Sequence, residues 1–493
     1  MNKSIVLYIL GTVLKIEGVF LLLPCLVALI YQEKEGLWYL LFAVICVILG
    51  TLITLRKPSN TVFYLKEGCA ATALSWMLLS FFGSLPLYFS GEIPHFIDAL
   101  FETVSGFTTT GATILTDVEA LSHCALFWRS FTHWIGGMGI LVFLLAIIPL
   151  SGGSNFNLMR AESPGPSVGK LVPNIKQTAR LLYAIYFGLT AIEFIFLLLG
   201  DMPVFDAINT AISTAGTGGF GVKNDSIAGY SAYIQWVVAV FMVLFGINFN
   251  AYYFLLMRQF RKAFQLKEVR LYLVVYVTAV LIIFIDLFRT VGNAFASLTQ
   301  SVFQVATLIS STGFATADFD LWPTTSRMVL LCLMFMGACA GSTGGGIKVS
   351  RIMLLFKTIK KETGSYIHPK SVKKVNMEGK PVEHEVIRSV NVYFMTFAVL
   401  FMGSTFLLTL DPGTDLTTCF TASVSMLNNM GPGFSLIGPT CNYAFFTILS
   451  KCVLMFDMLA GRLELFPVLI LFHPGLWKNS LSRPVRRKAA ADD

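Results

Sequence analysis

One short pattern occurs four times in this chain, and each copy follows a short apolar segment. The copies are Thr109-Thr110-Gly111, Thr217-Gly218-Gly219, Ser311-Thr312-Gly313 and Asn429-Met430-Gly431. Four diverged copies of one unit in a lipid-like sequence predict a ring of four backbone loops around a central axis. Such a ring can replace the hydration shell of an ion with carbonyl oxygens. The repeat therefore predicts a cation-conducting pore.

The composition is that of a polytopic membrane protein. Hydrophobic residues make up 55% of the chain and charged residues 13%, whereas an ordinary soluble domain has about 25% charged residues. The net charge of +8 would suggest nucleic acid as a partner of a soluble protein. In a membrane protein, basic residues instead mark cytoplasmic loops. Their placement is therefore more informative than their sum.

Two apolar spans, 5–31 and 36–55, open the chain and are expected to form a hairpin without the repeated pattern. Both are long enough to cross a bilayer. Lys15 and Glu17 fall inside the first span, where a charge at mid-bilayer is costly. We expect them to face neighbouring helices or to snorkel to the interface.

A unit of three apolar segments follows four times. The first segments are long spans at 68–89, 181–200, 272–288 and 390–410. Shorter segments that end at the glycine pattern lie at 94–106, 203–215, 295–310 and 415–428. The third segments are again long, at 127–150, 234–257, 328–358 and 443–472. Because the short segments cannot span about 30 Å of hydrocarbon, they are predicted to be re-entrant pore helices that share an aqueous axis.

The predicted fold is an all-α polytopic membrane protein with an N-terminal two-helix hairpin and four helix–pore helix–helix repeats around a central ion pore. The expected divisions are 1–58 for the hairpin, 59–168, 169–264 and 265–372 for the first three repeats, and 373–493 for the fourth repeat with a basic cytoplasmic tail. Asp98 precedes Gly111 by as many residues as Asp206 precedes Gly219. This spacing aligns Gly219, rather than Gly218, with the other pattern glycines.

Charge placement predicts the orientation in the membrane. Threading ten spans in order puts the basic clusters on one side: Arg56, Lys57, Arg160, Lys170, Lys176, Arg180, Arg258, Arg261, Lys262, Lys267, Arg270, the segment 357–388 and the tail 483–488. This side is cytoplasmic by the positive-inside rule, with both termini inside. The opposite side carries Glu92, Asp98, Glu102, Asp117, Glu119, Asp201, Asp206, Asp318, Asp320, Asp411 and Asp415. We expect an acidic outer mouth that concentrates cations.

The pattern residues suit cation coordination. The predicted pore helices end near Ser105, Ser213, Ser310 and Asn428, so their negative dipole ends would face the axis. The glycines let the backbone expose its carbonyls without a side chain in the way. Hydroxyl and amide side chains in the copies are expected to add oxygens or to brace the loops, and Asn429-Met430 leaves the oxygen contribution of the fourth copy open.

Longer motifs resemble the Trk potassium-uptake family over nearly the whole chain. They are the stretches 106–113 (GFTTTGAT), 134–140 (WIGGMGI), 341–348 (GSTGGGIK), 428–433 (NNMGPG) and 461–464 (GRLE), and the opening hairpin resembles the TrkH-type pore subunit. The resemblance implies a potassium-selective pore subunit of a bacterial inner-membrane system, with the filter glycines at Gly111, Gly219, Gly313 and Gly431. It further implies a homodimer with one pore per protomer, a cytoplasmic ring of nucleotide-binding TrkA-like regulatory subunits, K⁺ as the transported ion and no organic cofactor.

A segment rich in Gly, Ser and Thr, residues 337–346 and here called the glycine-rich segment, interrupts the second span of the third repeat. A kink or a close helix contact is the simpler explanation. The resemblance implies a flexible gate beneath the filter, formed by Gly341, Gly344, Gly345, Gly346 and Lys348. A phosphate-binding loop is excluded because Ile347 separates Gly346 from Lys348.

Two arginines lie in apolar surroundings. Arg462 has Asp457 and Glu464 nearby, so a structural ion pair is one reading. The resemblance instead places Arg462 in the cavity below the filter, where its charge raises the barrier for a cation. Arg129, at the outer end of its span among aromatic residues, is expected to be an interface anchor.

Two other function classes compete with a channel. A secondary transporter coupled to protons or sodium usually shows inverted repeats, whereas these four units share one orientation; passive and coupled flow both remain open. A membrane enzyme would need a cluster of titratable or metal-binding residues, but the six histidines are isolated and no HExxH motif occurs.

The nine cysteines are expected to pack in the protein interior, and one disulfide among Cys124, Cys419 and Cys441 is left open. Segment 357–388 is expected to dock the partner or to be a solvated connector.

Overall fold

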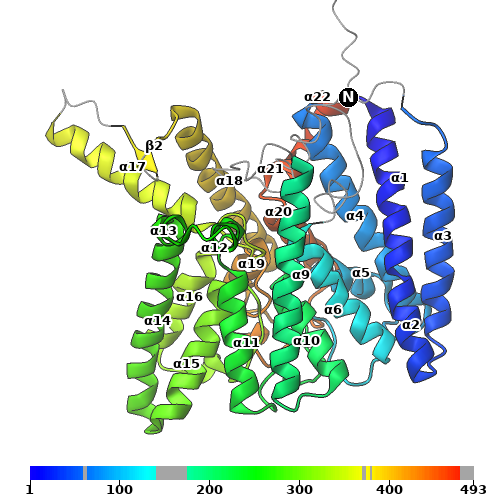
Figure 1. Ribbon diagram of the computed structural model, residues 1–493, viewed down its shortest axis with the longest axis horizontal. Coiled ribbons are helices and arrows are strands. Elements are labelled where there is room, and N and C mark those ends of the chain that lie inside the picture. The colour runs from blue at the N-terminus through cyan, green and yellow to red at the C-terminus, as the bar shows by residue number, and fades with distance from the viewer. Residues whose placement is uncertain (59–63, 140–174, 369–373, 378–379, 478–493) are drawn as a thin grey trace, which may run out of the picture.

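The computed structural model describes residues 1–58, 64–139, 175–368, 374–377 and 380–477. The chain forms a bundle of helices, most of them roughly parallel (Figure 1). Within these ranges, six helices are long and apolar enough to cross a membrane, and a bent helix pair adds up to one more. The predicted fold class is confirmed. The basic residues Arg160, Lys170 and 483–488 lie outside the described residues.

The N-terminal hairpin consists of α1 (Lys3–Phe20), α2 (Leu22–Tyr31) and α3 (Gly36–Thr54). It lies at one edge of the bundle, where α1 and α3 run side by side (Figure 1). Their backbones approach closely, since a Cβ atom on Gly50 would lie 2.5 Å from the carbonyl oxygen of Gly11. Glu17 is fully buried, and Lys15 lies against Gly50 of α3. Both charged residues therefore face a neighbouring helix, as expected.

The four repeats follow in chain order. Repeat 1 contains α4 (Leu65–Phe89), α5 (Phe96–Phe107) and α6 (His123–Met138). Repeat 2 contains α9 (Ile175–Leu199), α10 (Val204–Gly216), α11 (Ala232–Phe245), α12 (Phe249–Leu256) and α13 (Phe260–Gln265), the last ending one residue beyond the expected division. Repeat 3 contains α14 (Lys267–Val291), α15 (Ala294–Ile309), η1 (Phe319–Leu321), α16 (Thr324–Phe335) and α17 (Val349–Ile367).

Repeat 4 contains α18 (His384–Leu408), α19 (Leu416–Leu427), η2 (Ser435–Ile437), α20 (Ile448–Arg462), α21 (Phe466–Leu469), η3 (Ile470–Phe472) and α22 (Pro474–Trp477). Two short antiparallel strands, β1 (Asn376–Met377) and β2 (Lys380–Pro381), precede α18. The N-terminus, α22 and the projecting end of α17 lie at the same end of the bundle (Figure 1).

Burial follows the pattern expected in lipid. The short helices α5, α10, α15 and α19 are largely buried, whereas the long outer helices expose large apolar side chains such as Leu29, Ile30 and Val399. A soluble protein would rarely expose such a surface. All nine cysteines are within the described ranges, and each is a free thiol.

The second spans are interrupted, so the expectation of continuous helices at 234–257 and 443–472 is wrong. The axes of α11 and α12 differ by 92°, because the chain breaks after Phe245 and Asn248 starts a new helix by capping Asn250 N at 2.9 Å. In repeat 4, α20 starts only at Ile448 and ends at Arg462. The span expected at 127–150 appears as α6 up to Met138 and then leaves the described residues.

The hairpin turn is attached to repeat 1 by Glu33. Its carboxylate accepts hydrogen bonds from the amides of His123 (2.7 Å) and Cys124 (3.0 Å) at the start of α6, and Oε1 lies 2.8 Å from the His123 Nδ1. The Tyr31 ring stacks on the His123 ring at 3.9 Å between centroids. Burial of Glu33 opposes its ionisation, but the hydrogen bonds from His123 and Cys124 outweigh this effect and lower the pKa of Glu33.

This attachment predicts a pH-dependent stability. Glu33→Gln should lower the thermal unfolding temperature at pH 7, because an amide cannot accept all of these bonds. A folded pKa below the unfolded value of about 4.3 means that the stabilisation is present above pH 4.3 and is lost as the pH falls through the folded pKa. The difference from native protein should therefore vanish in acid. Glu35→Gln, in the same turn and without a capping bond, is the control; equal effects of both variants would contradict the assignment.

Candidate functional site

The four pore helices α5, α10, α15 and α19 end in the same way. A left-handed residue that is not glycine caps each helix or directly follows its cap: φ is 55° at Thr109, 53° at Thr217, 57° at Ser311 and 52° at Asn429. The next amide donates to a carbonyl five positions back, in the pairs Thr110–Ser105, Gly218–Ser213, Thr312–Thr307 and Met430–Ser425, at 2.8 to 3.0 Å. This is the Schellman arrangement of a helix C-terminus. It turns the chain out of each helix at an equivalent point.

The glycines that follow are also left-handed. Their φ angles are 77° at Gly111, 81° at Gly219, 94° at Gly313 and 91° at Gly431, whereas Gly218 has a negative φ. The structure thus places Gly219 at the position equivalent to the other three glycines. We call residues 109–111, 217–219, 311–313 and 429–431 loops 1 to 4.

The four loops form a closed ring. A Cβ atom built on each glycine would meet the carbonyl oxygen of the middle residue of the next loop: Gly111 meets Gly218 O at 2.0 Å, Gly219 meets Thr312 O at 2.2 Å, Gly313 meets Met430 O at 2.5 Å and Gly431 meets Thr110 O at 2.7 Å. The order of contacts runs from loop 1 to loop 4 and back to loop 1. Only glycine fits such an approach. Equivalent carbonyl groups from all four repeats therefore lie around one axis.

Side chains of the loops brace the ring. The hydroxyls of Thr108 and Thr110 are 2.8 Å apart, and those of Ser310 and Thr312 are 2.6 Å apart. Asn429 Nδ2 donates to the Thr110 hydroxyl at 3.0 Å and so joins loop 4 to loop 1. Met430 has an apolar side chain, but its carbonyl occupies the same position in the ring as those of the other middle residues.

A cavity of about 200 Å³ lies against the ring, and all four glycines line it. Its charged lining residues within the described ranges are Arg129 and Lys223, with no Asp or Glu among them. The expected acidic mouth is therefore not found at this cavity. Three of the acidic residues expected there are held in ion pairs instead: Glu102 with Arg129, Asp98 with Lys451 and Asp320 with Arg327. Oxygen atoms of the backbone, and not carboxylates, are what the ring can offer to a cation.

The glycine-rich segment packs against loops 3 and 4. The chain is non-helical from 336 to 348. The Gly345 amide donates to the Ser311 hydroxyl at 2.6 Å, and the Ile347 amide donates to Asn428 Oδ1 at 3.2 Å. A Cβ atom on Gly344 would lie 2.8 Å from Ser310 O. Because these contacts involve residues that precede the loop glycines, the segment lies on the side of the ring opposite the cavity.

Arg462 joins the ring to this segment. Its guanidinium donates to the Thr343 carbonyl (2.9 Å), to the Thr109 hydroxyl (3.1 Å) and to the carbonyls of Gly136 (2.5 Å) and Gly137 (2.7 Å). The neighbouring acids have other partners, since Asp457 accepts from Ser404 and Glu464 pairs with Arg351. Lys348 is buried and its ammonium donates to the Gly344 carbonyl.

These geometric findings agree with comparisons to known proteins. A model of the TrkH family, described as cation transport protein, matches residues 39–479. The chain belongs to the TrkH family of cation transport proteins. Membership confirms the resemblance predicted from the motifs and identifies a transport protein rather than an enzyme.

Relatives in the TrkH family cover almost the whole chain. The chain is 35% identical to the Trk system potassium uptake protein TrkH of Salmonella typhimurium, over 93% of this chain and 96% of that protein. It is 33% identical to the Trk system potassium uptake protein TrkG of Escherichia coli, over 97% of this chain and 100% of that protein. The crystal structure of the potassium transporter TrkH from Vibrio parahaemolyticus superimposes with a TM-score of 0.87 at 30% identity, covering 97% of this chain and 100% of that one.

Two residues beside the loops have roles that the sequence motifs do not predict. Arg129 is 3% exposed and pairs with Glu102, so its expected role as an interface anchor is wrong. The Tyr443 hydroxyl donates to the Gly431 carbonyl at 2.6 Å. The presence of both Glu102 and Arg129 within apolar segments could have indicated a buried ion pair, whereas nothing in the sequence marked Tyr443.

The left-handed cap residues predict a stability test. Among the described residues, the Thr217 hydroxyl bonds to its neighbour's carbonyl alone, Gly216 O at 2.6 Å. Thr217→Gly should therefore relieve the left-handed conformation and raise the free energy of unfolding by about 1 kcal/mol. Ser311→Gly should gain less or lose stability, because it also removes the bond to Gly345. Thermal unfolding in detergent measures both, and a destabilised Thr217→Gly would contradict the strain argument.

Proposed function

We propose that the chain is the pore-forming subunit of a potassium-uptake system and that K⁺ passes through the ring of loops 1 to 4. The main support for this proposal is the closed cycle in which each glycine contacts the carbonyl of the middle residue of the next loop. The names of the relatives, potassium uptake proteins, supply the identity of the ion. The proposed filter comprises Thr109, Thr110, Gly111, Thr217, Gly218, Gly219, Ser311, Thr312, Gly313, Asn429, Met430 and Gly431.

Electrostatics favour a cation at this ring. Four helix C-termini converge on it, and each carries a partial negative charge. Carbonyl oxygens on a braced backbone replace the water ligands of a dehydrated ion. Arg129, which lines the cavity, is paired with Glu102, so its charge does not cancel this preference.

We assign the glycine-rich segment, with Gly341, Gly344, Gly345, Gly346 and Lys348, as the gate in its closed position, locked by Arg462. The bonds from Gly345 to Ser311 and from Arg462 to Thr343 would have to break for the segment to leave the axis. Each is a modest contact, with a net value of about 1 kcal/mol for a typical hydrogen bond. The binding free energy of a partner protein can therefore be enough to open such a gate.

The remaining assignments concern the cellular setting. We propose a bacterial inner-membrane location with both termini cytoplasmic, a homodimer, and a nucleotide-binding TrkA-like partner. Support for a shared side comes from the N-terminus, α22 and the end of α17, which meet at one end of the bundle (Figure 1). The projecting helix α17 carries Lys357, Lys360 and Lys361 and suits a docking role.

Ion flux into liposomes tests the function directly. Purified protein should admit potassium in preference to sodium when the membrane potential is clamped, with reversal at the potassium equilibrium potential. Flux that instead requires a proton or sodium gradient would support the alternative, a coupled secondary potassium transporter. Protein that carries neither ion would contradict both.

Serine at any of the ring glycines should weaken potassium selectivity. The expected severity follows the closeness of the neighbouring carbonyl, with Gly111→Ser worst, then Gly219→Ser, Gly313→Ser and Gly431→Ser. Gly413→Ser is the matched control, because Gly413 has a similar φ of 85° but no atom within 4 Å of a built Cβ. The potassium-to-sodium permeability ratio is the measurement. A native ratio in all four ring variants would remove the filter assignment.

Loosening the gate should raise potassium flux. Ser311→Ala leaves the buried Gly345 amide without its acceptor in the closed position, at a cost of about 1–3 kcal/mol. Deletion of 341–346 should raise flux further. Ser342→Ala is the control, since this hydroxyl bonds to Cys339 O inside the same segment. Reduced flux together with loss of folded protein would indicate a structural kink rather than a gate.

A further inference from the structure

A buried ion pair lies directly behind loop 1. Glu102 in α5 and Arg129 in α6 have side chains that are 0% and 3% exposed. Glu102 Oε1 lies 2.7 Å from one terminal nitrogen of Arg129 and 2.8 Å from its Nε. This two-point contact fixes the orientation of both groups.

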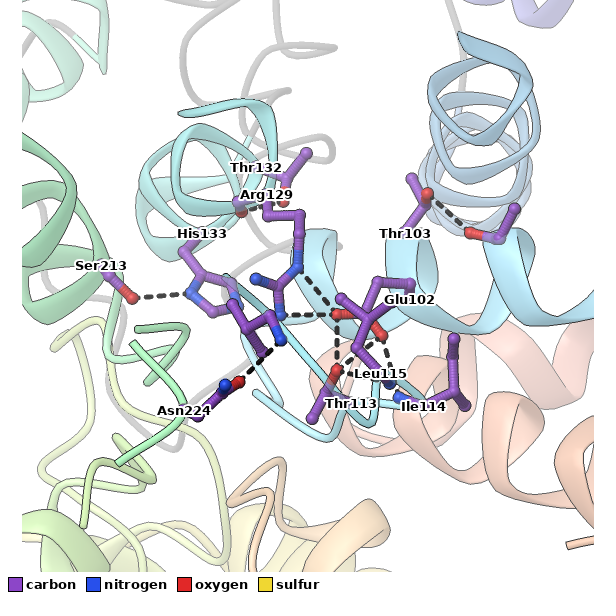
Figure 2. A network of polar contacts seen from close by, with 12 residues as sticks. Glu102, Thr103, Thr113, Ile114, Leu115, Arg129, Thr132, His133, Ser213 and Asn224 are labelled. Atoms are coloured by element: carbon purple, nitrogen blue, oxygen red, sulfur yellow. Dashed lines mark hydrogen bonds and ion pairs between the residues drawn. The ribbon is translucent and has the colours of Figure 1, made fainter. Parts of the chain in front are cut away.

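The same carboxylate holds the chain just beyond loop 1. Glu102 accepts hydrogen bonds from the Thr113 hydroxyl at 2.9 Å and from the Ile114 amide at 3.0 Å (Figure 2). Both oxygens are therefore occupied by donors from two different elements. A shift of the carboxylate would release the loop segment that follows Gly111.

Arg129 extends the contact to loop 2. Its guanidinium lies 4.1 Å from the centre of the Phe220 ring, and Phe220 directly follows Gly219. Phe220 in turn stacks on His133 at 4.2 Å, and the His133 Nδ1 lies 3.0 Å from the Ser213 hydroxyl near the end of α10. Figure 2 shows Arg129 and His133 side by side between Glu102 and Ser213. One network thus spans the junction of loops 1 and 2.

In repeat 3, a neutral residue holds the chain just after the loop. Gln304 precedes Gly313 by as many residues as Glu102 precedes Gly111. The Gln304 amide nitrogen lies 3.3 Å from the Ala317 carbonyl, just beyond loop 3. A neutral residue can therefore hold the chain after a loop. Buried ion pairs seldom stabilise more than neutral replacements do, so fold stability alone does not account for the charges in repeat 1.

We propose that the Glu102–Arg129 pair is a positioning pair that fixes the carbonyls of Thr110 and Gly218 and thereby sets the preference for potassium over sodium. This inference rests on the proposed function of the ring. A carbonyl site must be held within about 0.5 Å of its working geometry to distinguish similar ligands. The pair supplies that constraint where loops 1 and 2 meet.

The variants are Glu102→Gln, Arg129→Gln and the double variant. Each single change leaves a buried partner uncompensated, so the double variant, which removes both charges at similar volume, guards against simple loss of folding. Asp98→Asn is the matched control: it lies earlier in the same helix and breaks an ion pair with Lys451. Reversal potentials in mixed potassium and sodium give the permeability ratio, and size-exclusion profiles with thermal unfolding report folding.

We expect each single variant to lower the permeability ratio about tenfold, a change worth 1.4 kcal/mol, with no larger loss in the double variant because both residues act through one contact. Asp98→Asn should keep the native ratio. Native selectivity in the folded double variant would overturn the inference. So would a loss confined to Arg129→Gln, since the charge of Arg129 at the cavity wall, which Glu102→Gln retains, would then be responsible. A native protein without potassium preference would instead remove the proposed function itself.

Discussion

The approach of four glycines to four carbonyl oxygens is the constraint on which the rest of the structure depends. A Cβ atom built on each glycine would lie 2.0 to 2.7 Å from the neighbouring carbonyl oxygen, so no side chain fits between one loop and the next. Such an approach requires the chain to leave every pore helix at the same point and angle. The shared C-terminal caps with left-handed Thr109, Thr217, Ser311 and Asn429 provide this. Strain accepted at those residues is offset by the contacts that the ring makes possible.

The second constraint is that backbone polar groups inside a membrane need partners within the protein. The interrupted helices of repeats 2 and 3 satisfy one another: the Cys339 amide donates to Gly246 O at 3.1 Å, and the Phe249 amide donates to Gly341 O at 2.9 Å. Glu268 adds an acceptor for the Ala340 amide at 2.7 Å. The break after α11 and the glycine-rich segment are therefore parts of one arrangement. A straight helix in either place would leave the other without partners.

The membrane spans, the pore helices and the ring glycines could be predicted from the sequence, because the signals for them are local. Apolar length separated spans from pore helices, and equal spacing of Asp98 and Asp206 singled out Gly219. The interruption of the second span of repeat 3 was predicted from its glycines. The break in repeat 2 was missed, because apolar composition continues through it and the cause lies in contacts made by Asn248 and Glu268 across repeats. The role of Arg129 was also missed. A charge at the end of an apolar helix looks the same in sequence whether it faces lipid headgroups or a buried carboxylate.

The four repeats are equivalent at the ring but not behind it. Behind loops 1 and 2 lie the buried ion pair of Glu102 and Arg129 and the contact of Arg129 with the ring of Phe220. Loops 3 and 4 instead face the glycine-rich segment through Ser311 and Asn428. Loop 1 also meets this segment, through Arg462, which donates to the Thr109 hydroxyl and to the Thr343 carbonyl. In the proposed pore, the Glu102–Arg129 pair would keep the spacing of the Thr110 and Gly218 carbonyls when that link breaks and the segment moves.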